Sequence, residues 1–177
     1  MHLSTSPTKA QWRDLEIRLF GLPLEELWTL LAYDSRVQHI RQVLEARYAE
    51  AGLTITEISR ECGMTVSNLI RILRNLTGRT CYQLLISYRI HRSIKEALEV
   101  NSSFAEIALH NGFDNSASYS RTVRRVLGWP PSKLIPRGPM FRRELDLPPL
   151  DDNERLVKPA SKESNQAEKE TSRYDLG

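Results

Sequence analysis

Aromatic residues, cysteine and glycine are all scarce in this chain of 177 residues: 7% is aromatic, and there are 2 cysteines and 8 glycines. Together with 9 prolines, this composition argues against a β-sandwich and against a collagen-like chain. No stretch approaches the ~20 apolar residues that a membrane-spanning helix needs. The first residues contain no basic segment that leads into an apolar run, so we expect no secretory signal and a cytoplasmic protein.

Signatures of catalysis and of metal binding are also missing. The sequence contains no phosphate-binding Gly-Lys-Ser/Thr loop, no His-Glu-x-x-His, no Cys-x-x-Cys and no nucleophile elbow. The histidines are few and scattered along the chain: His2, His39, His91 and His110. Cys62 and Cys81 have no histidine at zinc-ligand spacing. We therefore expect no enzymatic activity, no cofactor, no metal and two reduced thiols.

Positive charge gathers in the middle of the chain. Residues 36–137 contain 15 Lys or Arg against 8 Asp or Glu, whereas residues 1–35 and 138–177 are each mildly acidic. Of the 15 cations 13 are arginines, whose planar guanidinium suits phosphate oxygens and guanine edges. An anionic partner such as a nucleic acid is one interpretation, and a solvated basic surface without a partner is the other.

The apolar pattern divides the chain into three segments and predicts an all-α fold. Residues 1–34 carry two short amphipathic helical patterns interrupted by Pro23. Residues 35–137 are helical in pattern almost throughout, with a first helix from about residue 35 to a stop near Gly52. Residues 138–177 contain prolines and charge runs without apolar spacing, so we expect a disordered tail there.

An internal repeat is the strongest signal. The segments 54–57 and 103–106 are capping-box patterns that lie 49 residues apart, and matching residues follow each of them. The matched pairs are Ile58 and Ile107, Gly63 and Gly112, Met64 and Phe113, Arg71 and Arg121, and Gly78 and Gly128. The offset changes from 49 to 50 after the apolar residue, which places one extra residue in the second turn. Each copy predicts a capped short helix, a glycine turn and a second helix with a cationic face, which is the helix-turn-helix pattern.

Between the two copies, residues 80–99 form one amphipathic run. A helix of this length measures roughly 28 Å, and successive major-groove faces of B-DNA are about 34 Å apart. The run can hold two recognition helices near that separation, and it is equally consistent with a central core helix of a bundle.

These residues resemble the DNA-binding region of the AraC/XylS family of bacterial transcription regulators over about 35–137. The resemblance rests on the segments 107–113, 115–121 and 128–131, which read Ile-Ala-Leu-His-Asn-Gly-Phe, Asn-Ser-Ala-Ser-Tyr-Ser-Arg and Gly-Trp-Pro-Pro. The Pro-x-Lys-Leu ending at residues 131–134 is similar to the InvF-like activators of secretion and virulence operons. The family usually has Phe where Leu73 and Val123 stand, which is a change between apolar packing residues.

The resemblance implies two recognition helices, at about 66–76 and 116–127, and a set of DNA contacts. The base-edge candidates are Ser67, Asn68, Ile70, Arg71, Ser116, Ala117, Ser118, Ser120 and Arg121. The phosphate candidates are Arg60, Arg74, Arg79, Arg89, Arg124, Arg125 and Lys133. Phosphate contacts supply affinity and base contacts supply sequence choice.

The resemblance also implies two partners, double-stranded DNA and RNA polymerase. It favours a role as an activator that places RNA polymerase at a bacterial promoter. The N-terminal segment offers Trp12, Phe20 and Trp28 as a surface for a small chaperone or a second copy, with packing on the core as the alternative. The competing function is a helical protein-interaction adaptor that acts through a partner with weak or no DNA specificity of its own. Arg121 has an alternative as well, because an intrahelical salt bridge or a phosphate contact is compatible with its position.

Overall fold

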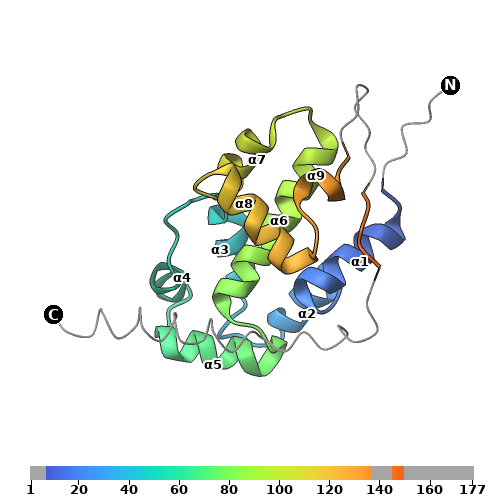
Figure 1. Cartoon of the computed structure of the whole chain (residues 1–177). Coiled ribbons are helices and arrows are strands. Elements are labelled where there is room, and N and C mark those ends of the chain that lie inside the picture. Colours follow the sequence, from blue (N-terminus) through green and yellow to red (C-terminus); the bar gives the residue numbers. More distant parts are fainter. Residues whose placement is uncertain (1–6, 137–144, 150–177) are drawn as a thin grey trace.

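The computed structural model describes residues 7–136 and 145–149, and every regular element in these ranges is a helix (Figure 1). The predicted all-α class is therefore confirmed for the described part of the chain. The helices are α1(Lys9–Phe20), α2(Leu24–Ala32), α3(Ile40–Arg47), α4(Ile55–Glu61), α5(Val66–Thr77), α6(Cys81–Glu99), α7(Phe104–His110), α8(Ser116–Leu127) and α9(Pro131–Leu134). None of them is long and apolar enough to cross a membrane.

The two predicted N-terminal helices are present as α1 and α2. Thr8 begins α1 with a capping box, since its hydroxyl accepts from the Gln11 backbone N–H while the Gln11 side chain accepts from the Thr8 N–H. The helix ends at Gly21, and Pro23 precedes the first residue of α2. The break lies where the proline ring removes a backbone donor.

The third helix is shorter than the sequence predicts. A series of turns occupies residues 34–39, in which the N–H groups of Val37 and Ile40 donate to the carbonyls three residues before them. The Asp34 carboxylate accepts from the Arg36 backbone N–H (3.0 Å) and so offers the backbone an alternative to the helix. At the other end α3 stops at Arg47, and short turns lead to the buried Leu53.

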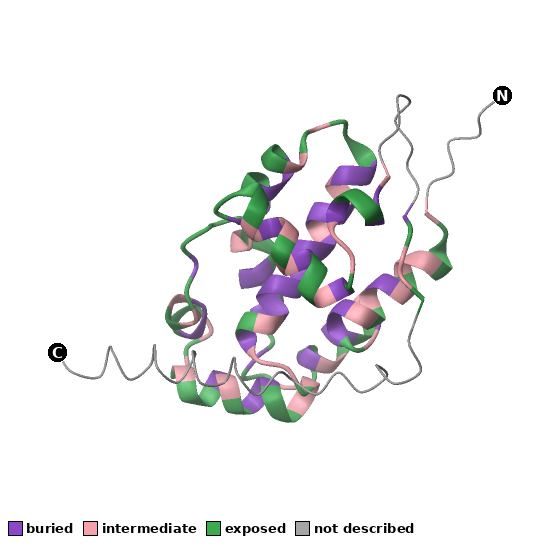
Figure 2. Ribbon diagram, in the orientation of Figure 1, coloured by how far each residue is buried: buried purple, intermediate pink, exposed green. Residues whose placement is uncertain are grey.

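The central helix α6 forms the middle of the molecule. It is 19 residues long, begins at the capping residue Thr80, and buries residues on every side. Helices α1, α5 and α7 all pack against it, and Figure 2 shows buried residues along most of its length. The helix is therefore both a core element and the link between the two copies of the repeat. The sequence was consistent with either role, and the structure combines them.

The two copies of the repeat fold in the same way. Both capping boxes form, and α4–α5 and α7–α8 are each a short helix, a tight turn and a longer helix. The N–H of Met64 donates to the carbonyl of Ser59, and that of Phe113 to Ala108 in the same register. The extra residue of the second copy is Asp114, which stands between Phe113 and the helix cap. The predicted pair of helix-turn-helix units is confirmed.

Part of the C-terminal segment packs on the body of the protein. Leu145 is buried, its carbonyl accepts from Gln11 Nε2 of α1 (2.9 Å), and the Asp146 N–H donates to the Leu134 carbonyl (2.8 Å). The sequence predicted a disordered tail over residues 138–177, but residues 145–149 of this segment are packed on the protein. The other residues of that segment lie outside the described part of the chain.

Candidate nucleic-acid interface

Helix α5 separates an apolar face from a polar face. Thr65 caps its N-terminus by accepting from the Asn68 backbone N–H. Leu69, Ile72 and Leu73 are buried against the core. The opposite face is exposed and carries Ser67, Asn68, Arg71, Arg74 and Asn75. The predicted Ile70 lies between the two faces and is half-buried.

Arg71 is held in a defined position on this face. Its guanidinium donates to the side-chain oxygen of Asn68 at 2.8 Å, one helical turn away. The cap of this helix is Thr65, and the Asn68 side chain instead holds the guanidinium of Arg71. The exposed face also contains Asn75, which we did not assign from the sequence. Its spacing of four residues from Arg71 is the signal that identifies it.

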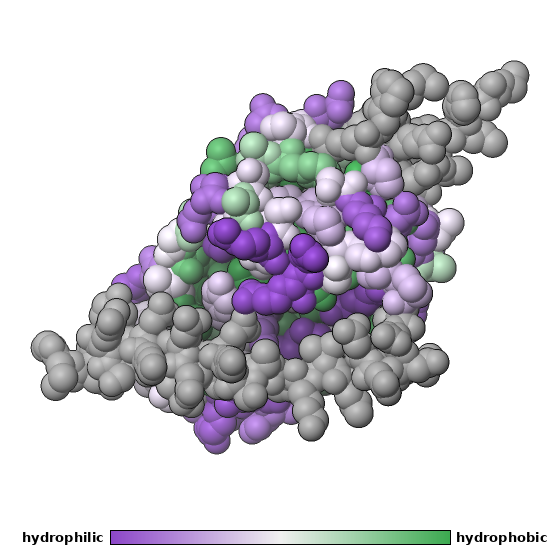
Figure 3. Space-filling model, viewed as in Figure 1, coloured by the Kyte–Doolittle hydropathy of each residue, from purple (hydrophilic) through white to green (hydrophobic). Residues whose placement is uncertain are grey.

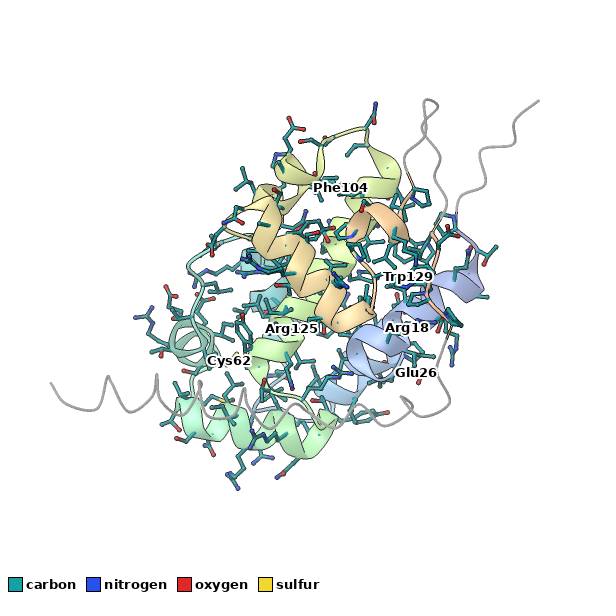
Figure 4. The ribbon with its side chains drawn as sticks, in the orientation of Figure 1. Arg18, Glu26, Cys62, Phe104, Arg125 and Trp129 are labelled. Carbon is teal, nitrogen blue, oxygen red and sulfur yellow. The ribbon has the colours of Figure 1, made fainter. Side chains whose placement is uncertain are left out.

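Helix α8 repeats this arrangement. Asn115 caps it by accepting from the Ser118 backbone N–H at 2.8 Å. Tyr119, Val123 and Leu127 face the core. The exposed residues are Ser116, Ala117, Arg121, Arg124 and Arg125, and the predicted Ser118 and Ser120 are half-buried beside them. Figure 4 shows Arg125 on this helix, near the end that lies against α1.

The two helices differ from the rest of the protein in their charge environment. Neither α5 nor α8 contains an aspartate or a glutamate. Outside these helices, five arginines pair with carboxylates: Arg13 with Glu26, Arg18 with Asp14, Arg36 with Asp34, Arg41 with Glu45, and Arg47 with Glu50, Glu57 and Glu61.

By contrast, several arginines of the repeat form no ion pair with any residue in 7–136 or 145–149. They are Arg60, Arg71, Arg74, Arg121 and Arg124. Figure 3 shows hydrophilic side chains gathered over α8 and along the edge formed by α5. The intrahelical salt bridge considered for Arg121 is thus not formed with any described carboxylate. These guanidinium groups remain able to bind an external anion.

Arg89 contradicts its predicted role as a phosphate contact. It is only 6% exposed, and its guanidinium donates to the carbonyls of Tyr48 (2.7 Å) and Glu50 (2.6 Å) after the end of α3. Burial lowers its pKa from the usual arginine value. The sequence shows a cation on a long amphipathic helix, but it does not show that α3 ends against that helix and presents two backbone carbonyls to it.

Two other predicted phosphate contacts lie close to other parts of the protein. Arg79 is half-buried after α5, and a Cβ added to Gly21 at the end of α1 would lie 3.6 Å from its Nη2. Lys133 is exposed on α9, with its ammonium 3.7 Å from the ring centroid of Trp129. Both remain predictions as phosphate contacts, and neither lies on α5 or α8.

The predicted partner surface is largely core. Phe20 is 1% exposed and Trp28 is 7% exposed. Trp28 packs edge-on against Tyr88 of α6 with ring centroids 5.9 Å apart, and the half-buried Trp12 lies 5.5 Å from the His91 ring. The prediction of a free surface formed by these aromatic residues is therefore wrong, and the packing alternative describes them, because the apolar stripe of α1 and α2 faces α6.

The cysteines and the acidic residues form no reactive or metal-binding site in the described ranges. No group of three or more His, Cys, Asp or Glu residues there is placed to hold a metal ion. Burial raises the pKa of Cys81 to about 12 and raises that of Cys62 as well. A thiol with a raised pKa carries little thiolate at neutral pH and is a poor nucleophile.

Comparison with known proteins agrees with this geometry. Residues 58–137 match a family of helix-turn-helix domains. The chain is 25% identical over 109 residues to the Msm operon regulatory protein of Streptococcus mutans, a match that covers 62% of this chain and 36% of that protein. This chain therefore spans about a third of the length of that relative.

Two solved structures share the fold. The C-terminal domain of AraT, a response regulator from Geobacillus stearothermophilus, superposes with a TM-score of 0.55 at 19% identity, covering 67% of this chain and 93% of that one. The DNA-binding domain of the global transcriptional factor AdpA, in complex with a target DNA, superposes with a TM-score of 0.51 at 24% identity, covering 56% and 88%.

Paired helix-turn-helix units on one central helix, with arginine-bearing second helices, define the class of the bipartite helix-turn-helix proteins. Within that class, residues 58–137 match the helix-turn-helix domain family, and the fold agrees with the resemblance seen in the sequence.

Proposed function

We propose that this chain binds double-stranded DNA as a sequence-specific transcription regulator, with α5 and α8 as its two recognition helices. The observation that carries the proposal is the pair of helices with arginines and no carboxylates, set in a protein whose N-terminal arginines are paired with carboxylates. Exposed guanidinium groups attract the phosphate backbone, and a guanidinium on a helix in the major groove reads guanine O6 and N7.

The roles within the site follow from position. Arg71 and Arg121 take the same place in the two repeats and are assigned to base edges, together with Asn68 and the serines at the start of α8. Arg60, Arg74 and Arg124 flank them and are assigned to phosphates. Because α8 exposes short side chains near its N-terminus, DNA shape supplies a larger share of the recognition there.

The finer functional assignments belong to the same proposal. AraC-type regulators suggest action at a bacterial promoter in the cytoplasm, as an activator that places RNA polymerase. The DNA complex of AdpA, which shares the fold, supports DNA as the partner. The proposal includes no catalytic step.

The test is a selection of duplexes from a random pool with the purified chain, followed by gel-shift measurements at physiological salt. Arg71→Ala and Arg121→Ala are each expected to weaken binding to the selected duplex by about 1–3 kcal/mol, since each removes one base-reading contact. Arg36→Ala is the matched control, because Arg36 is an exposed arginine in the turn before α3 and pairs with Asp34. Unchanged binding by both recognition-helix variants would overturn the assignment, and failure to enrich any duplex would favour the adaptor function.

A further inference from the structure

The N-terminal helices α1 and α2 contact both recognition helices. Helix α1 packs against α6 and α8, and α2 packs against α3 and α5. Figure 1 shows the pair beside the lower half of α6, next to the C-terminal end of α8 and close to α5. The pair therefore bridges the two helix-turn-helix units on a path separate from the central helix that connects them in the chain.

Apolar packing attaches this pair firmly to the body of the protein. Leu15, Leu19 and Phe20 of α1 and Leu27 and Leu31 of α2 are each at most 1% exposed. Burying one such side chain stabilises the packed arrangement by about 1.5–3 kcal/mol relative to leaving it exposed. Detachment of the pair would expose all five residues, so the pair is part of the folded body.

Polar contacts fix the position of α1 along α6. The hydroxyl of Ser87 donates to the carbonyl of Leu19 at 2.6 Å, in a buried position. The Glu16 carboxylate lies 3.3 Å from Nε2 of His91, and its other oxygen accepts from the Leu24 backbone N–H at 3.1 Å. These contacts hold the pKa of Glu16 below its usual value, with the His91 contact as the main cause. One carboxylate thus joins α1, α2 and α6, which defines the register among the three helices.

Further contacts connect the pair to the outer ends of the repeat. Gln11 near the start of α1 holds the Leu145 carbonyl, and Leu145 belongs to the segment packed on α9. At the other end, Arg79, which follows α5, lies beside Gly21. A guanidinium near a helix C-terminus interacts favourably with the exposed carbonyls there. Helix α1 therefore spans the distance from the end of the first unit to the end of the second.

We propose that α1 and α2 act as a brace that fixes the placement of α5 relative to α8 and makes the chain selective for one spacing between its two DNA half-sites. This inference rests on the DNA-binding function proposed above. Two units joined by one helix can adapt to altered spacing by bending, whereas two units held on two paths cannot. A preorganised pair also loses less conformational freedom when both units bind.

The test compares a selected duplex with a copy that has one base pair inserted between its half-sites. Wild-type protein is expected to bind the inserted duplex about tenfold or more weakly, because the second unit loses the effective concentration that correct spacing provides. Glu16→Ala removes the three-helix contact and Ser87→Ala removes the buried hydroxyl, so both variants are expected to show a severalfold smaller insertion penalty. Glu25→Ala, an exposed glutamate in the first turn of α2, is the matched control and should retain the wild-type penalty.

Thermal unfolding monitored by circular dichroism establishes that each variant is folded at the temperature of the binding measurement. Ser87→Ala is the milder variant and carries the test if Glu16→Ala is not folded. Equal insertion penalties in wild type and folded variants would overturn the brace while DNA binding itself stands. An equal loss of binding to both duplexes would also overturn it, since it would show a contribution to affinity alone. Failure of wild type to enrich any duplex would instead overturn the proposed function and the inference together.

Discussion

At the scale of single residues, the two turn glycines have the same backbone conformation in different surroundings. Gly63 and Gly112 have φ values of +68° and +79°, in the left-handed region that L side chains rarely adopt. A Cβ on Gly63 would meet nothing within 4 Å. A Cβ on Gly112 would lie 2.6 Å from the carbonyl oxygen of Tyr48 and 2.9 Å from Nε of Arg89. The second turn is therefore packed directly on the end of α3.

Replacement of each glycine by alanine separates these two effects. Gly63→Ala is expected to lower the free energy of unfolding by about 1–2 kcal/mol, the cost of the left-handed conformation for an L residue. Gly112→Ala is expected to lower the free energy of unfolding by about 1–3 kcal/mol more than Gly63→Ala, because the added methyl group overpacks its contact with Tyr48 and Arg89. Urea unfolding of both variants measures the difference, and equal losses would show that the contact with Tyr48 and Arg89 is easily relieved.

Arg89 shows how a residue's role depends on its partners. An arginine is exposed on α8, whereas Arg89 on α6 is buried and donates to two backbone carbonyls. Its guanidinium lies beneath the Gly112 turn and thus connects the end of α3 to the second helix-turn-helix unit. We therefore assign Arg89 to the structure of the domain and not to the DNA contact.

At the scale of elements, the short first helices of the two repeats depend on their capping boxes. The carboxylates of Glu57 and Glu106 accept from the backbone N–H and hydroxyl groups of Thr54 and Ser103, and these hydrogen bonds lower the pKa of both glutamates. A helix of 7 residues has few internal hydrogen bonds, so a cap contributes a large share of its stability.

The caps predict an acid dependence of stability. A carboxylate whose pKa is lower in the folded state stabilises the fold above its unfolded pKa of about 4.3, and the effect is lost as the pH falls through the folded value. The double variant Glu57→Gln with Glu106→Gln keeps the cap acceptors without a titrating proton. Its free energy of unfolding should fall less steeply below pH ~4.3 than that of wild type.

Glu99→Gln serves as the control for this measurement, since Glu99 is an exposed glutamate at the end of α6 and not part of a capping box. It should retain the acid dependence of the wild type in chemical denaturation at a series of pH values. An unchanged slope in the double variant would mean that the two caps contribute nothing to acid unfolding.

At the scale of the whole molecule, the separation of paired from unpaired arginines predicts a strong salt dependence of DNA binding. Each phosphate neutralised by a cation contributes about −0.9 to the slope of log affinity against log salt concentration. Arg74→Ala and Arg124→Ala, on exposed positions of α5 and α8, should each make that slope shallower by about 1. Binding isotherms at several salt concentrations measure this, with Arg36→Ala as a control of equal charge change.

A slope that neither variant changes would remove Arg74 and Arg124 from the set of phosphate contacts. Salt-insensitive DNA binding by the wild-type protein would be stronger evidence against the proposal. It would be incompatible with recognition through phosphates and would favour a protein partner. The outcome for Lys133 is independent of both, since its ammonium lies over the Trp129 ring on α9.

Local signals in the sequence were sufficient for the repeat and for most of the helices, although not for the bounds of α3. The capping boxes at Thr54 and Ser103, the two turn glycines and the 3.6-residue apolar spacing depend on neighbours in the chain, and each is found where the pattern predicts it. The bounds of α5 and α8 were predicted to within one residue for the same reason.

Tertiary structure alone decided which cations face solvent and what the N-terminal helices cover. Arg89 and Arg121 are both arginines on amphipathic helices, and only the position of α3 distinguishes the buried one from the exposed one. Likewise the stripe containing Phe20 and Trp28 predicts an apolar face but not its partner, which is α6 of the same chain. Helix caps and periodicity act over a few residues, whereas burial is set by contacts between segments far apart in the sequence.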